Sequence, residues 1–220
     1  MTIDEKYLET INRCPIFSIS GRFSTEDVLT ALHAEKRDYD KGDLIHKSGE
    51  PFFKFGILLD GCARACIDDI DGNSMIMAEI DVGSTFGESL CYLKIADSPV
   101  YVVSSERSTV LWLDPAMLFD NTDSPLKTEI QQNYTKMLAK RTLSMNTRIQ
   151  VLSKLRLRDK ILTYLSSVAN ETGEMTFSVP LSREDLATYI GADRTALSRE
   201  LSRLKREGVI DYYKNTFKIL

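Results

Sequence analysis

The sequence predicts an α+β protein built from three successive segments. Residues 39 to about 113 consist of short β-type runs separated by glycines, which is typical of antiparallel strands joined by tight turns. Residues 124 to about 154 repeat apolar side chains at steps of three and four without glycine or internal proline, which indicates one long helix. Residues 155–220 contain short helical patterns followed by two β-type runs. We expect the domain boundaries at 1–123, 124–154 and 155–220.

Composition and length agree with a globular protein that has a real core. The chain has 220 residues, 43% hydrophobic and 27% charged, which is ordinary for a soluble domain. No stretch approaches the roughly 18 apolar residues of a membrane span, and the acidic start lacks the apolar stretch of a signal peptide. We therefore expect a cytoplasmic protein that does not associate with a membrane.

Charge is distributed unevenly along the chain. The net charge is −4, yet from residue 156 onward there are 11 Lys and Arg against 9 Asp and Glu, whereas the preceding residues hold 17 against 23. The sign of this asymmetry is the one expected if only the C-terminal segment meets phosphate groups.

The first segment predicts an antiparallel sandwich or barrel. Glycines recur at intervals of one strand and one turn, and apolar and polar residues alternate in residues 58–67 and 74–80. The tripeptide at residues 71–73, Asp-Gly-Asn, is a strong hairpin signal between these two runs. No helix separates the strands, so a parallel βαβ arrangement is disfavoured.

The second segment predicts a helix that is too long to be buried against one small sheet. Ser124 suits the N-cap and Pro125 the first turn. Its spare apolar stripe is a candidate seam with a second copy of the chain, although Arg141 and Arg148 interrupt a strict heptad. The alternative is a helix that lies wholly on its own domain. The apolar stripe consists of Ile130, Tyr134, Met137, Leu138, Met145, Ile149 and Leu152.

The stretch REDLATYIGADRTALSRELSRLKREGVI in the third segment predicts two helices joined by a sharp corner. Ser182 and Asp185 fit a capping box at the start of the first helix. Gly191 suits a left-handed helix end, and Asp193 can cap a second helix running from Arg194 towards Glu207. The buried sides are predicted to be Leu186, Ala187 and Ile190 in the first helix, and Leu197, Leu201 and Leu204 in the second.

The outward side of the second helix has the composition of a DNA-reading surface. It presents two arginines and several small hydroxyl residues near the helix N-terminus. Arginine donates to guanine edges or phosphates, and small residues let the backbone enter the major groove. A β-hairpin around residues 214–216 follows, which favours DNA binding over an idle helical hairpin. The predicted surface is Arg194, Thr195, Ser198, Arg199 and Ser202.

The ordered motifs of the whole chain resemble the Crp/Fnr family of bacterial transcription regulators. YDKGDLIHKSGEPFFKFGILLDGCARACIDDIDGNSMIMAEIDVGSTFGE carries the family landmarks K-G, G-E, D-G, D-G and F-G-E in order, and DLATYIGADRTALSRELSRLKREGVI carries its helix-turn-helix pattern. The resemblance implies a cupin-like β-roll sensor, a dimerisation helix and a winged helix-turn-helix. It also implies a homodimeric, non-enzymatic regulator that binds a palindromic site on double-stranded DNA and contacts RNA polymerase.

Carried over by position, the resemblance also implies roles for individual residues. Bases would face Arg194, Thr195, Ser198 and Arg199, and phosphates would face Arg183, Arg203 and Lys205. One departure affects specificity, since many relatives have a glutamate where this chain has Thr195. We therefore expect a DNA consensus that differs from the common family half-site.

The residues present disfavour two sensing chemistries of the family. Relatives that bind cyclic AMP carry an Arg-Ser pair about ten residues after Gly-Glu, whereas Gly87-Glu88 is followed by Ser98-Pro99, and without the arginine fork cyclic AMP is disfavoured. An iron–sulfur cluster is disfavoured because Cys14 is the lone N-terminal cysteine.

Haem and a thiol switch stay open as alternatives to a diffusible organic effector. His33 and His46 are the two histidines available as haem ligands, and a thiol switch would use one of Cys62, Cys66 or Cys91. The ordinary interpretation of these cysteines is that they are buried thiols.

The interpretation we favour for the sensor is a small organic effector bound between the β-roll and the long helix, with the sequence assigning no cofactor and no metal. A metal enzyme on the same roll is disfavoured because such sites need more histidines than the chain holds. A DNA-tethered adaptor whose roll binds a protein is a further alternative. The expected pocket is Phe86, Glu88, Leu90, Tyr92, Val100 and Val102 on the roll, with Tyr134, Leu138 and Met145 on the helix.

Overall fold

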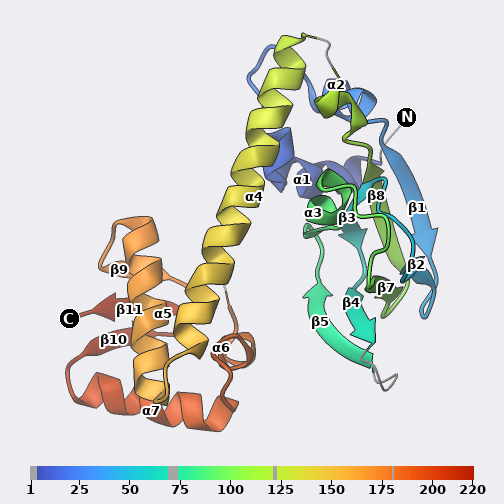
Figure 1. The fold of residues 1–220 in the computed structure, drawn as a ribbon. Coiled ribbons are helices and arrows are strands. Elements are labelled where there is room, and N and C mark those ends of the chain that lie inside the picture. Colours follow the sequence, from blue (N-terminus) through green and yellow to red (C-terminus); the bar gives the residue numbers. More distant parts are fainter. Residues whose placement is uncertain (1–3, 69–73, 121–122, 180) are drawn as a thin grey trace. The chain divides into compact units, whose positions relative to one another are not determined.

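The computed structural model of the chain describes residues 4–68, 74–120, 123–179 and 181–220 (Figure 1). The chain forms two compact units, Met1–Leu138 and Ala139–Leu220. Helix α4 (Pro125–Leu152) contributes its first half to one unit and its second half to the other. It begins at Pro125, as the sequence predicts. Among the described residues, no helix is long and apolar enough to cross a membrane.

The first unit is built on two four-stranded antiparallel sheets, which confirms the predicted fold class. One sheet has the order β1-β8-β3-β6 and the other β2-β7-β4-β5. The predicted hairpin tripeptide at 71–73 lies outside the described residues, but the strands on either side of it pair with Asp68 opposite Ser74. The strands are β1 (Glu35–Tyr39), β2 (Leu44–His46), β3 (Phe55–Asp60), β4 (Ala63–Asp68), β5 (Ser74–Ile80), β6 (Thr85–Phe86), β7 (Val100–Ser104) and β8 (Ser108–Leu113).

Strands β3 and β8 are buried on both faces, and this divides the unit into two cores. Ile57 and Leu111 pack in a core with the helices, whereas Leu58 and Val110 point into a core between the two sheets. Double burial explains why these strands read as continuous apolar runs rather than as alternating ones. The helices of this unit are α1 (Glu5–Arg13), η1 (Pro15–Phe17), α2 (Thr25–Ala31), α3 (Glu88–Tyr92), η2 (Ala116–Phe119) and the first half of α4.

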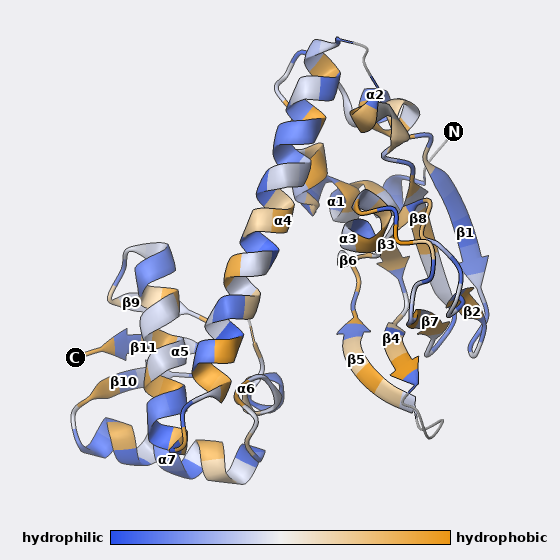
Figure 2. Cartoon of the chain, in the orientation of Figure 1, coloured by the Kyte–Doolittle hydropathy of each residue, from blue (hydrophilic) through white to orange (hydrophobic). Residues whose placement is uncertain are grey.

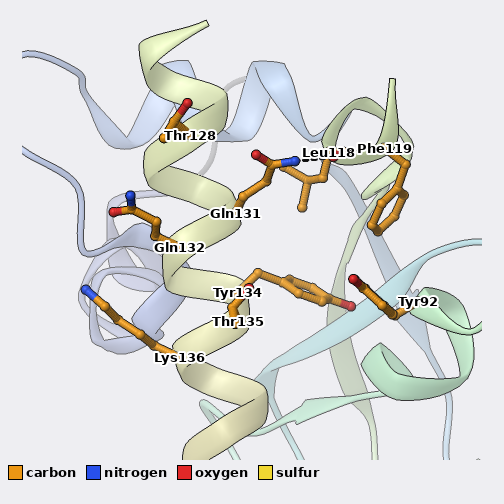
Figure 3. Close-up of a pocket in the computed structure, with 9 residues that line it drawn as sticks. All are labelled: Tyr92, Leu118, Phe119, Thr128, Gln131, Gln132, Tyr134, Thr135 and Lys136. Carbon is orange, nitrogen blue, oxygen red and sulfur yellow. Dashed lines mark hydrogen bonds between the residues drawn. The ribbon is translucent and has the colours of Figure 1, made fainter. Parts of the chain in front are cut away.

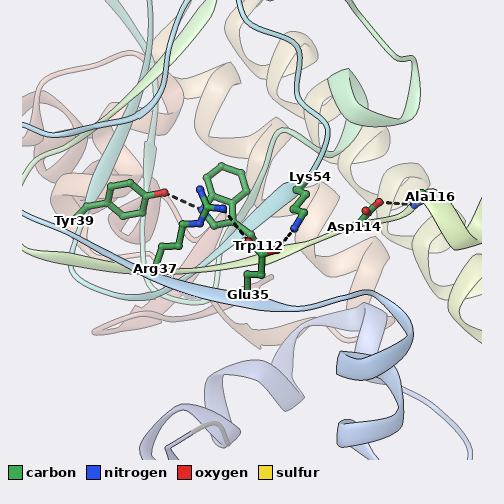
Figure 4. Close-up of polar contacts among 7 residues, drawn as sticks. All are labelled: Glu35, Arg37, Tyr39, Lys54, Trp112, Asp114 and Ala116. Carbon is green, nitrogen blue, oxygen red and sulfur yellow. Dashed lines mark hydrogen bonds and ion pairs between the residues drawn. The ribbon is translucent and has the colours of Figure 1, made fainter. Parts of the chain in front are cut away.

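Polar contacts tie the edge strand β1 to its neighbours (Figure 4). The Trp112 indole N–H donates to the Tyr39 hydroxyl at 2.9 Å. The Glu35 carboxylate accepts from both Lys54 and Arg37. Because these charged groups are partly exposed, each pair adds about 1 kcal/mol or less, and the burial of the indole is the larger contribution.

Gly87, which caps α3, has a backbone that other residues adopt only with strain. Its φ is +78°, and a Cβ built there would lie 2.5 Å from Cδ1 of Phe52. Phe52 is buried and stacks on His46 with ring centroids 3.5 Å apart. Close approach of this ring to the chain therefore depends on the absence of a side chain at residue 87.

We expect Gly87→Ala to lower the free energy of unfolding of the first unit by about 2–3 kcal/mol, because left-handed strain and overpacking against Phe52 add. Denaturant unfolding followed by fluorescence of the single tryptophan, Trp112, measures this. Gly42→Ala is the matched control, since Gly42 has φ +90° but nothing lies within 4 Å of its Cβ position. Equal losses in the two variants would show that the Phe52 contact contributes nothing.

The second unit packs helices on a small three-stranded sheet. The sheet order is β10-β11-β9, with β10 and β11 forming the terminal hairpin. One apolar core joins the helices to the sheet, with Leu197, Leu204 and Phe217 fully buried. The elements are the second half of α4, α5 (Leu157–Thr172), β9 (Thr176–Ser178), α6 (Arg183–Ile190), α7 (Arg194–Arg206), β10 (Ile210–Tyr213) and β11 (Thr216–Ile219).

Candidate nucleic-acid interface and sensor cavity

The corner between α6 and α7 is fixed by local hydrogen bonds that the sequence predicts. The Ser182 and Asp185 side chains form a capping box at the start of α6. Gly191 ends α6 with φ +64° and ψ +55°, the left-handed conformation. The Asp193 carboxylate accepts from the backbone amides of Thr195 and Ala196 at 2.8 and 2.9 Å. These amide bonds, that of Ala196 first, lower the pKa of Asp193 and keep it ionised at the N-terminus of α7.

Helix α7 has one buried side and one exposed side. Leu197, Leu201 and Leu204 are at most 1% exposed and anchor the helix on the core of the second unit. Exposed side chains follow the opposite face over two and a half turns, which confirms the predicted division of the helix. The exposed side chains are those of Arg194, Thr195, Ser198, Arg199 and Ser202. A shallow hollow of about 680 Å³ runs along this side and is lined in part by Thr195, Ser198, Arg199 and Ser202.

Two of the three basic residues in the last turn of α7, Arg203 and Lys205, are held by acidic neighbours. Arg203 donates to Glu207 at 2.9 Å. The Lys205 ammonium lies 2.6 Å from an Asp211 carboxylate oxygen and donates to the backbone carbonyl of Tyr212 at 3.1 Å. Both side chains are exposed, so these contacts orient the charges without removing them from solvent.

Arg183, in the first turn of α6, packs against the terminal hairpin. Its guanidinium carbon lies 4.9 Å from the ring centroid of Phe217 and 5.1 Å from that of Tyr212, and it donates to the backbone carbonyl of Lys214. Partial burial lowers the pKa of this guanidinium. The hairpin turn is therefore joined to the start of α6 by a stacked and hydrogen-bonded arginine.

We expect Arg183→Lys to loosen this joint, because an ammonium cannot stack on two rings and keep a planar fork on the carbonyl. The local opening free energy of the hairpin should fall by about 1–2 kcal/mol. Hydrogen exchange of the β10 and β11 amides measures it. Arg206→Lys, at an exposed position of α7, is the control and should leave exchange unchanged. Unchanged exchange in Arg183→Lys as well would contradict the joint.

The second half of α4 is part of the same unit as the α6–α7 corner. The Arg148 guanidinium carbon lies 5.6 Å from the Tyr189 ring centroid. Cδ2 of Leu152 lies 3.2 Å from the Cβ position of Gly191. From α5, Lys160 donates to the Ile190 carbonyl at 3.1 Å. The periodicity of the sequence does not predict these contacts, because they join residues of different elements that only the tertiary structure brings together.

A cavity of about 520 Å³ lies in the first unit, against the first half of α4 (Figure 3). The Tyr134 hydroxyl donates to the Glu88 carbonyl at 2.8 Å, which joins α4 to the start of α3. The Tyr92 ring stacks on Tyr134 at 5.9 Å and meets Phe119 edge-on at 5.0 Å. The lining combines these rings with amides, hydroxyls and one lysine. It comprises Tyr92, Leu118, Phe119, Thr128, Gln131, Gln132, Tyr134, Thr135 and Lys136.

The structure brings together only part of the pocket expected from the sequence. Tyr92 and Tyr134 line the cavity, whereas Phe86, Glu88 and Val102 are buried in the interior. Leu90, Val100 and Leu138 are half-buried, and Met145 is 60% exposed on the part of α4 that belongs to the second unit. The lining residues that sequence reasoning missed are mostly polar, including Thr128, Gln131, Gln132, Thr135 and Lys136. The sequence signal that could have identified them is their spacing of three and four residues along α4.

Comparison with known proteins finds a family model that matches residues of each unit. The family model of the cyclic nucleotide-binding domain matches residues 36–120, and that of the Crp-like helix-turn-helix domain matches residues 155–220. Electron transport regulator A of Shewanella oneidensis is 23% identical over 190 residues, which is 84% of this chain and 74% of that protein. Transcriptional activator protein FnrL of Cereibacter sphaeroides is 40% identical over 62 residues, 24% of this chain and 25% of that protein.

The solved structure of DNR from Pseudomonas aeruginosa has the same fold, with a TM-score of 0.53 and 20% identity over 100% of this chain and 96% of that chain. The chain belongs to the Crp/Fnr family. It is a DNA-binding transcription regulator with an effector-binding domain, and the relatives that it resembles are regulators rather than enzymes.

The chain's own side chains pack at Gly87 and Ser98, the positions of this Crp/Fnr chain that correspond to the cyclic-AMP motif. Phe52 lies against Gly87, directly in front of the first residue of α3. Ser98, at the place where cyclic-AMP relatives carry arginine, is fully buried, and its hydroxyl accepts from the Val100 amide at 3.2 Å. A hydroxyl with a local partner cannot replace the two forked donors that an arginine offers to a phosphate.

Three of the four cysteines of this Crp/Fnr chain lie in environments that lower the reactivity of their thiols. Burial raises the pKa of the Cys91 thiol to about 12 and that of Cys14 to about 11, and it also raises the pKa of the less buried Cys62. Thiols of this kind stay protonated at neutral pH. His46 is half-buried against Phe52, and its Nε2 lies 3.1 Å from the Glu50 carbonyl oxygen, whereas His33 is exposed. Within the described residues, no three metal-binding side chains gather.

Proposed function

We propose that this protein is a homodimeric regulator that reads a palindromic DNA site with α7 of each protomer and responds to a small organic effector in the α4 cavity. The observation that carries the proposal is the exposed side of α7, where Arg194, Thr195, Ser198 and Arg199 stand free of the core that holds Leu197 and Leu201. We place the domain boundaries at 1–123, 124–154 and 155–220 in this functional division, with RNA polymerase as the further partner.

The α7 surface supports base reading by its N-terminal half and phosphate contact by its C-terminal end. Arg199 offers the planar pair of donors that fits the O6 and N7 acceptors of guanine. Arg203 and Lys205 are oriented by acidic partners at the C-terminal end of the helix. Arg183 serves the interface indirectly, because it fixes the hairpin turn that would lie along the DNA backbone. Thr195 replaces a carboxylate acceptor with a short hydroxyl, so cytosine is not the expected base opposite it.

The exposed stripe on the second half of α4 supports a dimer. Met145, Ile149 and Leu152 are 60%, 63% and 42% exposed, and with Leu138 and Thr142 they repeat at steps of four and three residues. That spacing is the one with which two helices interlock side chains along a shared seam. The alternation of polar and apolar residues along this helix is visible in Figure 2. Two copies joined here would place two α7 helices for half-sites whose centres are about 34 Å apart.

The α4 cavity supports a small-molecule effector. Its volume of about 520 Å³ suits a small molecule, and its walls combine aromatic rings with a few amide and hydroxyl groups. Tyr134 lies in the wall and bonds α3, and α4 continues from there into the second unit. An effector that favours one position of α4 would shift the population of dimers able to present both α7 helices.

Selection from random double-stranded DNA with the full-length protein tests the DNA part of the proposal. We expect an enriched palindrome whose half-site differs from the common family sequence. Recovery of the common palindrome would contradict the role of Thr195, and no enrichment would contradict sequence reading altogether. Affinity for the selected site is then measured with a panel of organic acids and phenols, with cyclic AMP, and under oxidising and reducing conditions. Equal affinity in every condition would overturn control by an effector or by redox state.

A further inference from the structure

A second cavity of about 510 Å³ lies in the first unit. Its lining differs from that of the α4 cavity, except for one shared residue. It is formed by the loop before β3, the end of α3 and the turn between β8 and η2. Phe119 borders both cavities. The other walls are mainly aromatic and apolar side chains. The lining comprises Pro51, Phe52, Phe53, Cys91, Lys94, Ala96, Asp114, Pro115, Ala116 and Phe119.

Two charged groups face this apolar cavity, and they differ in what already binds them. One oxygen of Asp114 accepts from the Ala116 amide at 2.8 Å (Figure 4). The Asp114 carboxylate also lies close enough to the Cys91 thiol to raise its pKa, after the larger effect of burial. Lys94 is exposed, and no ion pair involves it within the part of the chain that the structure describes. No ion pair involves Asp114 either, but its carboxylate accepts a hydrogen bond, whereas no side-chain hydrogen bond involves the Lys94 ammonium within the described residues.

The backbone at Lys94 gives a second, independent indication. Lys94 follows α3 in the left-handed region, with φ +51°. Glycine is usual at this position after a helix, because a side chain there costs energy. A non-glycine residue held in this conformation at the rim of a cavity is a candidate for a functional role.

We propose that this second cavity binds a small carboxylic acid with an aromatic or branched aliphatic body. The body lies against Phe52, Phe53 and Phe119, and the carboxylate pairs with the Lys94 ammonium. Few polar groups on an apolar lining are the usual composition of a small-molecule site. A charge-assisted hydrogen bond from a lysine to a carboxylate supplies the selectivity for an anion. The site is distinct from the effector cavity proposed above and does not depend on it.

Phenylacetate is the probe, and 2-phenylethylamine is its cationic counterpart of nearly the same shape. Isothermal titration calorimetry on the full-length protein should show saturable binding of phenylacetate, with the amine bound at least about tenfold more weakly. No heat from phenylacetate, or an equal or tighter affinity for the amine, would overturn the proposal.

Variants at exposed positions locate the binding without threatening the fold. Lys94→Met should weaken phenylacetate binding about tenfold, which is the loss expected for one charge-assisted hydrogen bond. The Phe53 side chain is 77% exposed, and Phe53→Ala should weaken phenylacetate binding by a smaller factor than Lys94→Met does. Lys41→Met is the matched control, because it removes an exposed lysine from the turn before β2, and it should bind as the unaltered protein does.

The α4 cavity holds its own lysine, Lys136, which allows the two cavities to be told apart. Binding that survives in Lys94→Met but is lost in Lys136→Met would place phenylacetate in the α4 cavity and overturn the assignment to the second cavity. Binding lost in Lys94→Met and kept in Lys136→Met would support it. Neither outcome depends on whether phenylacetate changes DNA affinity.

Discussion

Replacing Arg199 with glutamine should abolish preference for the selected palindrome while leaving the fold intact. Arg199 is exposed and lies on the side of α7 opposite Leu197 and Leu201, so its removal leaves no cavity. A bidentate arginine–guanine contact contributes about 1–3 kcal/mol of discrimination at each half-site. A dimer carries two such contacts, so specific affinity should fall by a factor on the order of 100 or more. Fluorescence anisotropy with the selected site and with a scrambled duplex measures both affinities.

Arg203→Gln provides the matched control for this prediction. Arg203 lies one turn further along the same helix and is paired with Glu207. As a phosphate contact it should weaken binding to the selected and scrambled duplexes by similar factors and reduce the salt dependence of binding. If Arg199→Gln also weakened both duplexes equally, Arg199 would be a phosphate contact, and its assignment as a base reader would be wrong.

Introducing charge on the exposed stripe of α4 should convert the protein to a monomer. In the double variant Met145→Glu and Ile149→Glu, four carboxylates would have to enter one apolar seam, at a desolvation cost of several kcal/mol. We expect monomers in sedimentation velocity at micromolar concentration. We also expect at least a hundredfold loss of affinity for the palindrome, because a monomer contacts one half-site.

Leu143→Glu is the control for the seam. Leu143 is 64% exposed on the same part of α4, but it lies outside the repeat of Leu138, Met145, Ile149 and Leu152. It should remain dimeric. If this variant dissociated while the double variant did not, the contact surface would lie on another side of α4. A dimer in both variants would show that α4 does not hold the copies together.

The architecture of the second unit follows directly from the sequence because its determinants are local. Capping by Ser182 and Asp193 and the left-handed glycine at 191 each act within a few residues. The leucines of α7 repeat with the period of the helix, so the buried side also fixes the exposed side. The limits of α6 and α7 and the exposed side of α7 could therefore be inferred together.

The sensor cavity could be predicted only in part, because its walls depend on long-range packing. Tyr134 was predictable as an apolar position of α4, but the sequence does not reveal that its hydroxyl bonds the carbonyl of Glu88. Phe86 and Val102 are apolar, as residues of a pocket wall usually are, but both are buried in the core between the sheets. Burial on both faces of β3 and β8 uses more of the apolar residues than alternation alone would suggest. The polar positions of α4 were left to line the cavity.

Helix α4 runs from Pro125 to Leu152 as a single α-helix without a glycine or internal proline. Tyr134 is fixed in the core of one unit and Val151 in the core of the other. Such a helix lacks the glycine and internal proline at which sharp kinks usually form. One continuous series of backbone hydrogen bonds therefore runs from a residue of the first core to a residue of the second, so a single element of secondary structure belongs to both.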